Sequence, residues 1–289
     1  MRLREALASG KFVITAEVGP PKGTNVEHIL EEAEHFRGRV DAVNVTDLQA
    51  AAMRLGSLAT CHLLRERGHQ PVLQVVCRDR NRLALQSDLL SAWVLGVENV
   101  LCLTGDYPTL GDHKGAKPVY DLDSVQLLAA AQGLNEGHDL EGNALDGAPD
   151  FLLGAVVTPG GNPVEAQVLK LEKKVAAGAR FVQTQAVYEL EQFARFMDRV
   201  SPLGVPILAG IVLLKSAGMA RYMNNNVAGV HVPDPLIERM ATTDNKVATS
   251  IEIAAELCRQ LRRYCRGVHL MPLGWGQHVP AVLEAAGLS

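Results

Sequence analysis

Short apolar runs rich in β-branched residues alternate along the chain with longer segments of helical periodicity. This alternation is typical of repeated strand–helix units that build a parallel sheet. Eight runs have the composition of strands: "KFVITAEV", "DAVNVTD", "PVLQVVCR", "NVLCLTGD", "FLLGAVVT", "RFVQTQAVY", "VPILAGIVLL" and "GVHLMPLG". Eight units favour a closed barrel. An open doubly wound sheet is the alternative, but no strand is followed by the spaced glycines of a dinucleotide fingerprint.

The segments between these strands have the apolar spacing of amphipathic helices, and several end at glycine, the common C-cap residue. No change in composition marks a linker. The pattern therefore predicts an α/β fold, a (β/α)8 TIM barrel, as a single domain over residues 1–289. One further segment, "VHVPDPLIERMA" at 230–241, is expected to form a small insertion on the barrel rim.

Composition narrows the class of protein. Of the 289 residues, 47% are hydrophobic and 21% are charged, and the formal charge is −4. These values are typical of a soluble globular protein and disfavour nucleic acid as a partner. The first residues, "MRLREALASGKFV", mix charged with apolar side chains, so they do not have the form of a signal peptide. No apolar stretch is long enough to suggest a membrane span.

Cysteine usage indicates the compartment. The chain has an odd number of cysteines and no C-x-x-C pair, which argues against a disulfide framework and against a zinc site. We therefore expect reduced thiols, a cytoplasmic location and no bound metal. The five cysteines are Cys61, Cys77, Cys102, Cys258 and Cys265.

Polar residues recur on one face of several predicted strands. Alternate side chains of a barrel strand point inward, and Val13, Thr15 and Glu17 share one such face. The same alternation places Asn44 and Thr46 on one face, and leaves Gln74 between apolar neighbours. It also places Cys102, Thr104 and Asp106 on one face of the fourth strand, and Gln183 and Gln185 on one face of the sixth. Because the carboxyl ends of the strands meet at the face that carries the chemistry of such barrels, Glu17, Thr46, Asp106 and Gln185 are expected to line one pocket.

Each of these residues has a simpler explanation when taken alone. A glutamate at a strand end can pair with a lysine or arginine, an aspartate can start a turn, and a buried glutamine can satisfy backbone groups. The meeting of four of them favours an active site. Two loops, "TGDYPTLGDHKGAKP" and "GGNP", contain glycines that could hold an anion with backbone amides, although neither is a P-loop.

Four motifs then match a known family in order along nearly the whole chain. They are "AEVGPP", "VNVTD", "LTGD" and "KLEKKVAAGARFVQTQ". Together the motifs resemble those of the methylenetetrahydrofolate reductases, flavin-dependent (β/α)8 barrels of one-carbon metabolism. The resemblance implies a ping-pong cycle. NAD(P)H reduces a bound flavin, FAD or alternatively FMN, which passes hydride to 5,10-methylenetetrahydrofolate to give 5-methyltetrahydrofolate, or the reverse.

The resemblance also assigns roles to residues. Glu17 matches the general acid that protonates N10 of the folate, Asp106 the aspartate that meets the pterin near the flavin, and Gln185 a folate-contacting glutamine. The remaining implied contacts are with the flavin, and Asp106 is expected to share in them. These cofactor residues are Thr46, Asp47, Gln74, Leu103, Thr104, Gly105, Tyr120, Asp121, Asn162 and Lys174.

Some positions depart from the common family pattern. Thr104 stands where the family commonly has arginine, and Gln74 where it commonly has histidine. Such departures resemble members from anaerobic bacteria, some of which work with a separate electron-delivering subunit. The electron donor is thus expected to be NAD(P)H or such a partner, and the chain is expected to form an oligomer. A flavin-free reductase that uses NAD(P)H directly, and a folate-binding subunit active only within a complex, remain alternatives.

Overall fold

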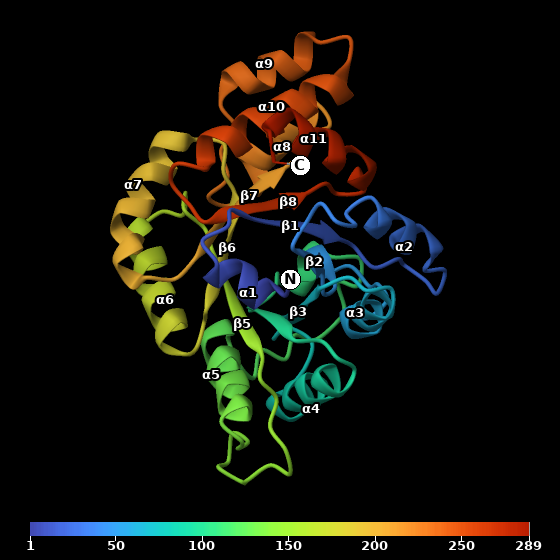
Figure 1. The fold of residues 1–289 in the computed structure, drawn as a ribbon, viewed down its shortest axis with the longest axis vertical. Coiled ribbons are helices and arrows are strands. Elements are labelled where there is room, and N and C mark those ends of the chain that lie inside the picture. The colour runs from blue at the N-terminus through green and yellow to red at the C-terminus, as the bar shows by residue number, and fades with distance from the viewer. Residues whose placement is uncertain (289) are drawn as a thin grey trace.

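The strands close into a barrel. In the computed structural model, which describes residues 1–288, eight parallel strands follow one another in chain order and β8 pairs with β1 (Figure 1). This confirms the predicted (β/α)8 fold. The strands are β1 (Val13–Val18), β2 (Ala42–Val45), β3 (Pro71–Val76), β4 (Asn99–Leu103), β5 (Leu152–Val157), β6 (Phe181–Ala186), β7 (Ile207–Val212) and β8 (Gly267–Met271).

Helices surround this barrel. After β1 to β6 come α2 (Glu27–Glu34), α3 (Ser57–Glu66), α4 (Arg82–Val94), α5 (Ser124–Asn135), α6 (Val164–Ala176) and α7 (Leu190–Val200). After β7 come α8 (Ala217–Asn226), α9 (Asp234–Thr242) and α10 (Lys246–Leu261), and α11 (Val279–Ala286) follows β8. Short 3-10 turns lie at Gln49–Ala51, Pro108–Leu110, Ser201–Leu203 and Gly276–His278.

The first helix, α1 (Leu3–Ala8), closes the amino end of the barrel. Its apolar residues Leu3, Ala6 and Leu7 have helical spacing, and all three are buried. They pack in one cluster with the inward-facing residues of the strands, Val13, Ala42, Val72, Leu101, Leu152, Phe181 and Leu208. The charged run at the start of the chain therefore folds into a plug that gives the barrel an apolar floor.

One close contact shows how this floor is filled. Gly154 on β5 has no side chain, and the ring of Phe181 on β6 occupies the space. A Cβ atom at position 154 would lie 2.3 Å from the Phe181 Cζ atom. Full burial of a phenylalanine contributes about 2–3 kcal/mol. The glycine is therefore needed for packing rather than for a turn.

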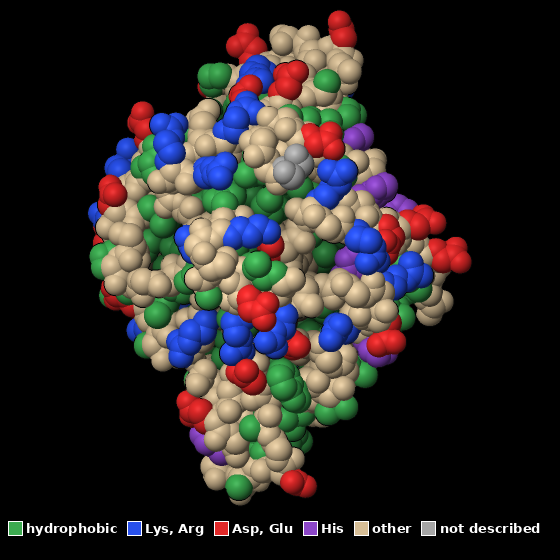
Figure 2. Space-filling model, in the orientation of Figure 1, with side chains coloured by type: hydrophobic (Ala, Val, Ile, Leu, Met, Phe, Trp, Pro, Cys, Tyr) green, Lys and Arg blue, Asp and Glu red, His purple; other side chains and the backbone are tan. Residues whose placement is uncertain are grey.

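The segment predicted as an insertion forms α9, which lies outside α8 and α10 at one end of the molecule (Figure 1). On the face shown in Figure 2, basic and acidic side chains are interspersed rather than gathered by sign. That face offers no extended basic surface of the kind that nucleic-acid binding uses. None of the helices within residues 1–288 combines the length and the apolar character that crossing a membrane requires.

Candidate functional site

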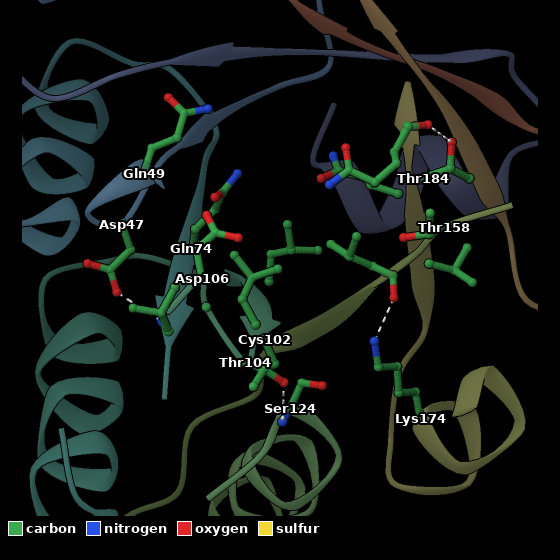
Figure 3. A pocket seen from close by; sticks show the side chains of 18 of the residues that line it. Asp47, Gln49, Gln74, Cys102, Thr104, Asp106, Ser124, Thr158, Lys174 and Thr184 are labelled. Carbon is green, nitrogen blue, oxygen red and sulfur yellow. Dashed lines mark hydrogen bonds between the residues drawn. The ribbon is translucent and has the colours of Figure 1, made fainter. Parts of the chain in front are cut away.

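A cavity of about 470 Å³ opens at the carboxyl ends of the strands (Figure 3). Ligand sites of (β/α)8 barrels lie at this end, and the volume is in the usual range for small-molecule pockets. Glu17, Gln74 and Gln185 line it from β1, β3 and β6. Loops and neighbouring helices add Asp47, Gln49, Arg78, Thr104, Gly105, Asp106, Ser124, Lys170 and Lys174.

Glu17 places a buried carboxylate in this cavity, with 8% of its surface exposed. Gln49 Nε2 donates to one carboxylate oxygen and Gln74 Nε2 to the other, each at 3.2 Å. The Nε2 atom of His269 lies 3.6 Å from Glu17 Oε2. Amide donors from β3 and from the loop after β2 therefore hold the carboxyl group at the end of β1, and the imidazole on β8 lies beside it.

Below Glu17 lies a second set of buried polar side chains, Thr15, Asn44, Gln183 and His269. Asn44 and Gln183 exchange amide hydrogen bonds of 2.7 and 3.1 Å across the barrel. Gln183 Nε2 also donates to Thr15 Oγ1 at 3.1 Å, and Thr15 Oγ1 lies 2.9 Å from His269 Nδ1. This polar layer, Thr15–Asn44–Gln183–His269, separates the cavity from the apolar floor.

Asp106 reaches the cavity through a change in backbone direction. It follows Gly105, whose φ of +92° lies in the left-handed region that favours glycine. Asp106 is exposed and its side chain lines the cavity, as does that of Gln74 (Figure 3). The backbone oxygen of Asp106 accepts hydrogen bonds from Arg78 at 3.2 Å and from the Tyr120 hydroxyl at 3.0 Å. The loop after β4 is thus tied by two donors at the backbone oxygen of the aspartate itself.

The opposite end of the cavity is basic. Lys174 on α6 is buried, and its ammonium group donates to the backbone oxygen of Val156 at 2.6 Å. Burial, and next the charge of Lys170, lower the pKa of Lys174 from 10.5 to about 8. Nearby, Thr104 Oγ1 accepts from the backbone N–H of Ser124, the first residue of α5, at 3.2 Å. Two lysines and the start of a helix suit an anion at this end.

The orientation predicted for the middle of β4 is wrong. Leu101 and Leu103 pack toward the barrel interior, whereas Cys102 belongs to the outer core between the strands and helices. Cys102 and Thr104 line the cavity from this outer side, next to α5 and α6. Burial raises the pKa of the Cys102 thiol above its ordinary value of 9.0. Both faces of β4 are covered, so composition alone did not distinguish them.

Asp47 lines the cavity but has a structural task. Its carboxylate accepts from the backbone N–H of Val76 at 2.9 Å and pairs with Arg80, which also binds Asp88. Burial raises the pKa of Asp47, against the opposing effect of Arg80. Both bonds end on Oδ2 and tie the end of β2 to the end of β3.

Four predicted cofactor residues lie outside the cavity lining. The hydroxyl oxygen of Thr46 is buried and has no hydrogen-bond partner among residues 1–288. The Tyr120 hydroxyl donates to the backbone oxygen atoms of Gly105 and Asp106. Asp121 accepts from the backbone and the side chain of Arg82, and Asn162 is exposed in the loop after β5. Their roles toward a cofactor stay predictions.

Sequence reasoning missed several residues that the structure brings to the site, among them Ser124 and Lys170 at its basic end. His269 lies on β8 with the parity of Gly267 and Met271, so the alternation within "GVHLM" could have identified it. Gln49 lies in a turn, and Arg78 lies just beyond β3, where its guanidinium pairs with Asp79. No local sequence pattern marks Gln49 or Arg78 as a site residue, because contacts made in the folded chain bring them to the cavity.

Comparison with known proteins agrees with the motifs. A family model described as methylenetetrahydrofolate reductase matches residues 2–287. Methylenetetrahydrofolate reductase 2 of Schizosaccharomyces pombe is 25% identical over 318 residues, which cover 99% of this chain and 47% of that protein. The 5,10-methylenetetrahydrofolate reductase of Pectobacterium carotovorum subsp. carotovorum is 24% identical over 269 residues, which cover 90% of this chain and 84% of that protein. The chain thus spans about half of the yeast relative and most of the bacterial one.

Solved structures support the fold. An uncharacterized Clostridium thermocellum protein that binds two copies of 5-methyl-5,6,7,8-tetrahydrofolic acid has a TM-score of 0.64. The match covers 98% of this chain and 97% of that one at 17% identity, a level that shows the fold alone. Since the family model extends over nearly all of the sequence, the chain belongs to the methylenetetrahydrofolate reductase family.

Proposed function

We propose that the protein catalyses the flavin-dependent reduction of 5,10-methylenetetrahydrofolate to 5-methyltetrahydrofolate, or the reverse, in a ping-pong cycle. The observation that carries this proposal is the position of Glu17. Its carboxyl group lies in the cavity at the carboxyl end of β1, and Asp106 and Gln185 line the same cavity. Opening a methylene bridge requires an acid, and holding a pterin requires polar groups of these types.

The basic end of the cavity suits the phosphate of a flavin, FAD or FMN. A buried ammonium group that forms no ion pair with residues 1–288 gains stability when an anion arrives, and Lys174 is such a group. Lys170 and the first backbone amides of α5 would add to this attraction. Leu103, Thr104 and Gly105 would line the flavin. When bound, the flavin supplies the hydride.

Glu17 would supply the proton. It donates a proton to N10 of the folate, the bond between N10 and the methylene carbon breaks, and the 5-iminium cation that forms accepts hydride to become the methyl group. Asp106 would stabilise the positive charge of that cation. The Gln185 amide can both donate to and accept from a pterin edge.

The source of electrons is part of the proposal. NADH, NADPH or a separate electron-delivering subunit would reduce the enzyme, which we expect to work as a cytoplasmic oligomer. The test is to record the absorption spectrum of the purified protein, to identify any released cofactor, and then to assay folate turnover with NADH, NADPH and a reduced dye. A flavin spectrum with turnover supports the proposal.

Other outcomes would favour the alternatives. Turnover with NAD(P)H in colourless protein that is not stimulated by added FAD or FMN would indicate a flavin-free reductase. Tight folate binding without turnover under any of the three donors would indicate a folate-binding subunit that is active only within a complex. Absence of both binding and turnover would refute the proposed function.

A further inference from the structure

The polar layer beneath the cavity contains an ionisable side chain for which the proposed reaction has no role so far. His269 is 3% exposed, and its partners Thr15, Asn44 and Gln183 are 0%, 0% and 2% exposed. Buried polar groups are costly unless they are paired, and here each of the four is paired with another member of the layer. The imidazole is therefore held in one place by the barrel itself.

The hydrogen bonds of the layer also decide which ring nitrogen carries the proton. Asn44 donates to Gln183 Oε1 at 2.7 Å, which leaves the Gln183 amide nitrogen to face Thr15 Oγ1 at 3.1 Å and His269 Nδ1 at 3.4 Å. Since Thr15 Oγ1 accepts from Gln183, its own proton is free to be donated to Nδ1. The two Gln183 amide protons go to Asn44 Oδ1 and Thr15 Oγ1, so the Thr15 hydroxyl is the donor that faces Nδ1. Nδ1 thus acts as an acceptor, and the neutral ring carries its proton on Nε2.

The protonated nitrogen points toward the proposed general acid. His269 Nε2 lies 3.6 Å from Glu17 Oε2, and the two groups that hydrogen-bond to this carboxylate, Gln49 and Gln74, are amides that do not ionise. The charged groups elsewhere in the cavity lining are Asp47, Arg78, Asp106, Lys170 and Lys174. Of the basic side chains within residues 1–288, His269 is the one whose nitrogen lies next to the Glu17 carboxylate, at 3.6 Å.

We infer that His269 is a positioning residue for Glu17. Its Nε2–H group orients the carboxyl group, and it stabilises the carboxylate that remains after Glu17 has given its proton to N10. The proton moves from Glu17 Oε to N10, the imidazole keeps its own proton throughout, and Glu17 regains a proton from solvent after the product leaves. This inference rests on the proposed function, because it needs Glu17 to act as the acid.

Two amide substitutions separate the roles of the ring nitrogens. The side-chain amide of His269→Gln reaches the place of Nε2, whereas that of His269→Asn reaches only the place of Nδ1 and keeps the contact with Thr15. We expect His269→Asn to lower kcat for folate turnover by up to about 100-fold, the cost of misplacing a reacting group. The KM for the folate should change by less than about threefold, and His269→Gln should recover most of the lost kcat.

Thermal unfolding of both variants is measured first. If His269→Asn fails to fold, Thr15→Val and Thr15→Ser replace the pair, since only serine keeps the hydroxyl group that sets the tautomer. Equal kcat values within the matched pair, or a loss that appears in KM alone, would overturn the inference. Inactive wild-type protein would instead refute the proposed function, so the two failures are distinguishable.

Discussion

Lys174 offers a direct test of the basic end of the cavity. The substitution Lys174→Met removes the buried ammonium group and keeps an unbranched apolar side chain of similar length. Lys174 is buried, donates to the Val156 oxygen, and has a pKa of about 8 in place of 10.5, mainly because burial disfavours its charge. A fall of this size corresponds to roughly 3 kcal/mol of destabilisation of the charged form.

The direction in which stability changes with pH follows from proton binding. Below pH 8 the folded and unfolded chains both hold the proton, and the folded chain bears the full cost of burying the charge. Between pH 8 and 10.5 the unfolded chain keeps a proton that the folded chain has released, so the free energy of unfolding rises with pH in this window. The substitution also removes the hydrogen bond to Val156, and this loss offsets about 1 kcal/mol of the gain in stability. We therefore expect Lys174→Met to stabilise the ligand-free protein by about 2 kcal/mol at pH 7.

Urea unfolding followed by circular dichroism, at pH values from 7 to 10, measures this difference. The exposed neighbour Lys173 provides the matched control, because Lys173→Met should change stability by less than about 0.5 kcal/mol. Added FMN should stabilise the wild type more than Lys174→Met, since only the wild type presents the ammonium group to the phosphate. A Lys174→Met protein that is no more stable than wild type at pH 7, with the same pH dependence, would refute the reasoning.

Three further substitutions test other parts of the structure. Glu17→Gln keeps the shape but removes the acid, and folate turnover should fall by about 100-fold or more while folate binding, measured by calorimetry, persists. Gly154→Ala brings a Cβ atom to 2.3 Å from the Phe181 ring, so unfolding in urea should show a loss of about 1–3 kcal/mol. Asp47→Ala removes the buried oxygen that accepts from the Val76 N–H and from Arg80, and should lower stability by about 3 kcal/mol.

Matched controls exist for two of these. Glu27 is an exposed glutamate, and Glu27→Gln should leave turnover within about twofold of wild type. Gly23 has open space where a Cβ atom would lie, so Gly23→Ala should change stability by less than about 0.5 kcal/mol. Full turnover by Glu17→Gln, or equal stability of the two alanine variants, would contradict the corresponding argument.

Much of the fold and part of the site could be predicted because their signals are local. Each strand is a short apolar run, and eight of them in alternation with helices leave few architectures open. The alternation within a strand then places Glu17, Gln74 and Gln185 on the inner face, and all three line the cavity. The side chain of a strand residue alternates with period two whatever the strand packs against.

The tertiary structure decided what touches what. β4 is covered on both faces, so its pattern did not reveal that Leu103 faces inward and Cys102 outward. His269 meets Glu17 only because β8 closes against β1, which joins positions at opposite ends of the chain. By itself, the sequence determined a barrel of this family with an acid at the end of its first strand. The burial of Lys174, which the motifs had already named, and the place of the histidine beneath that acid depend on packing between distant segments, which no local pattern encodes.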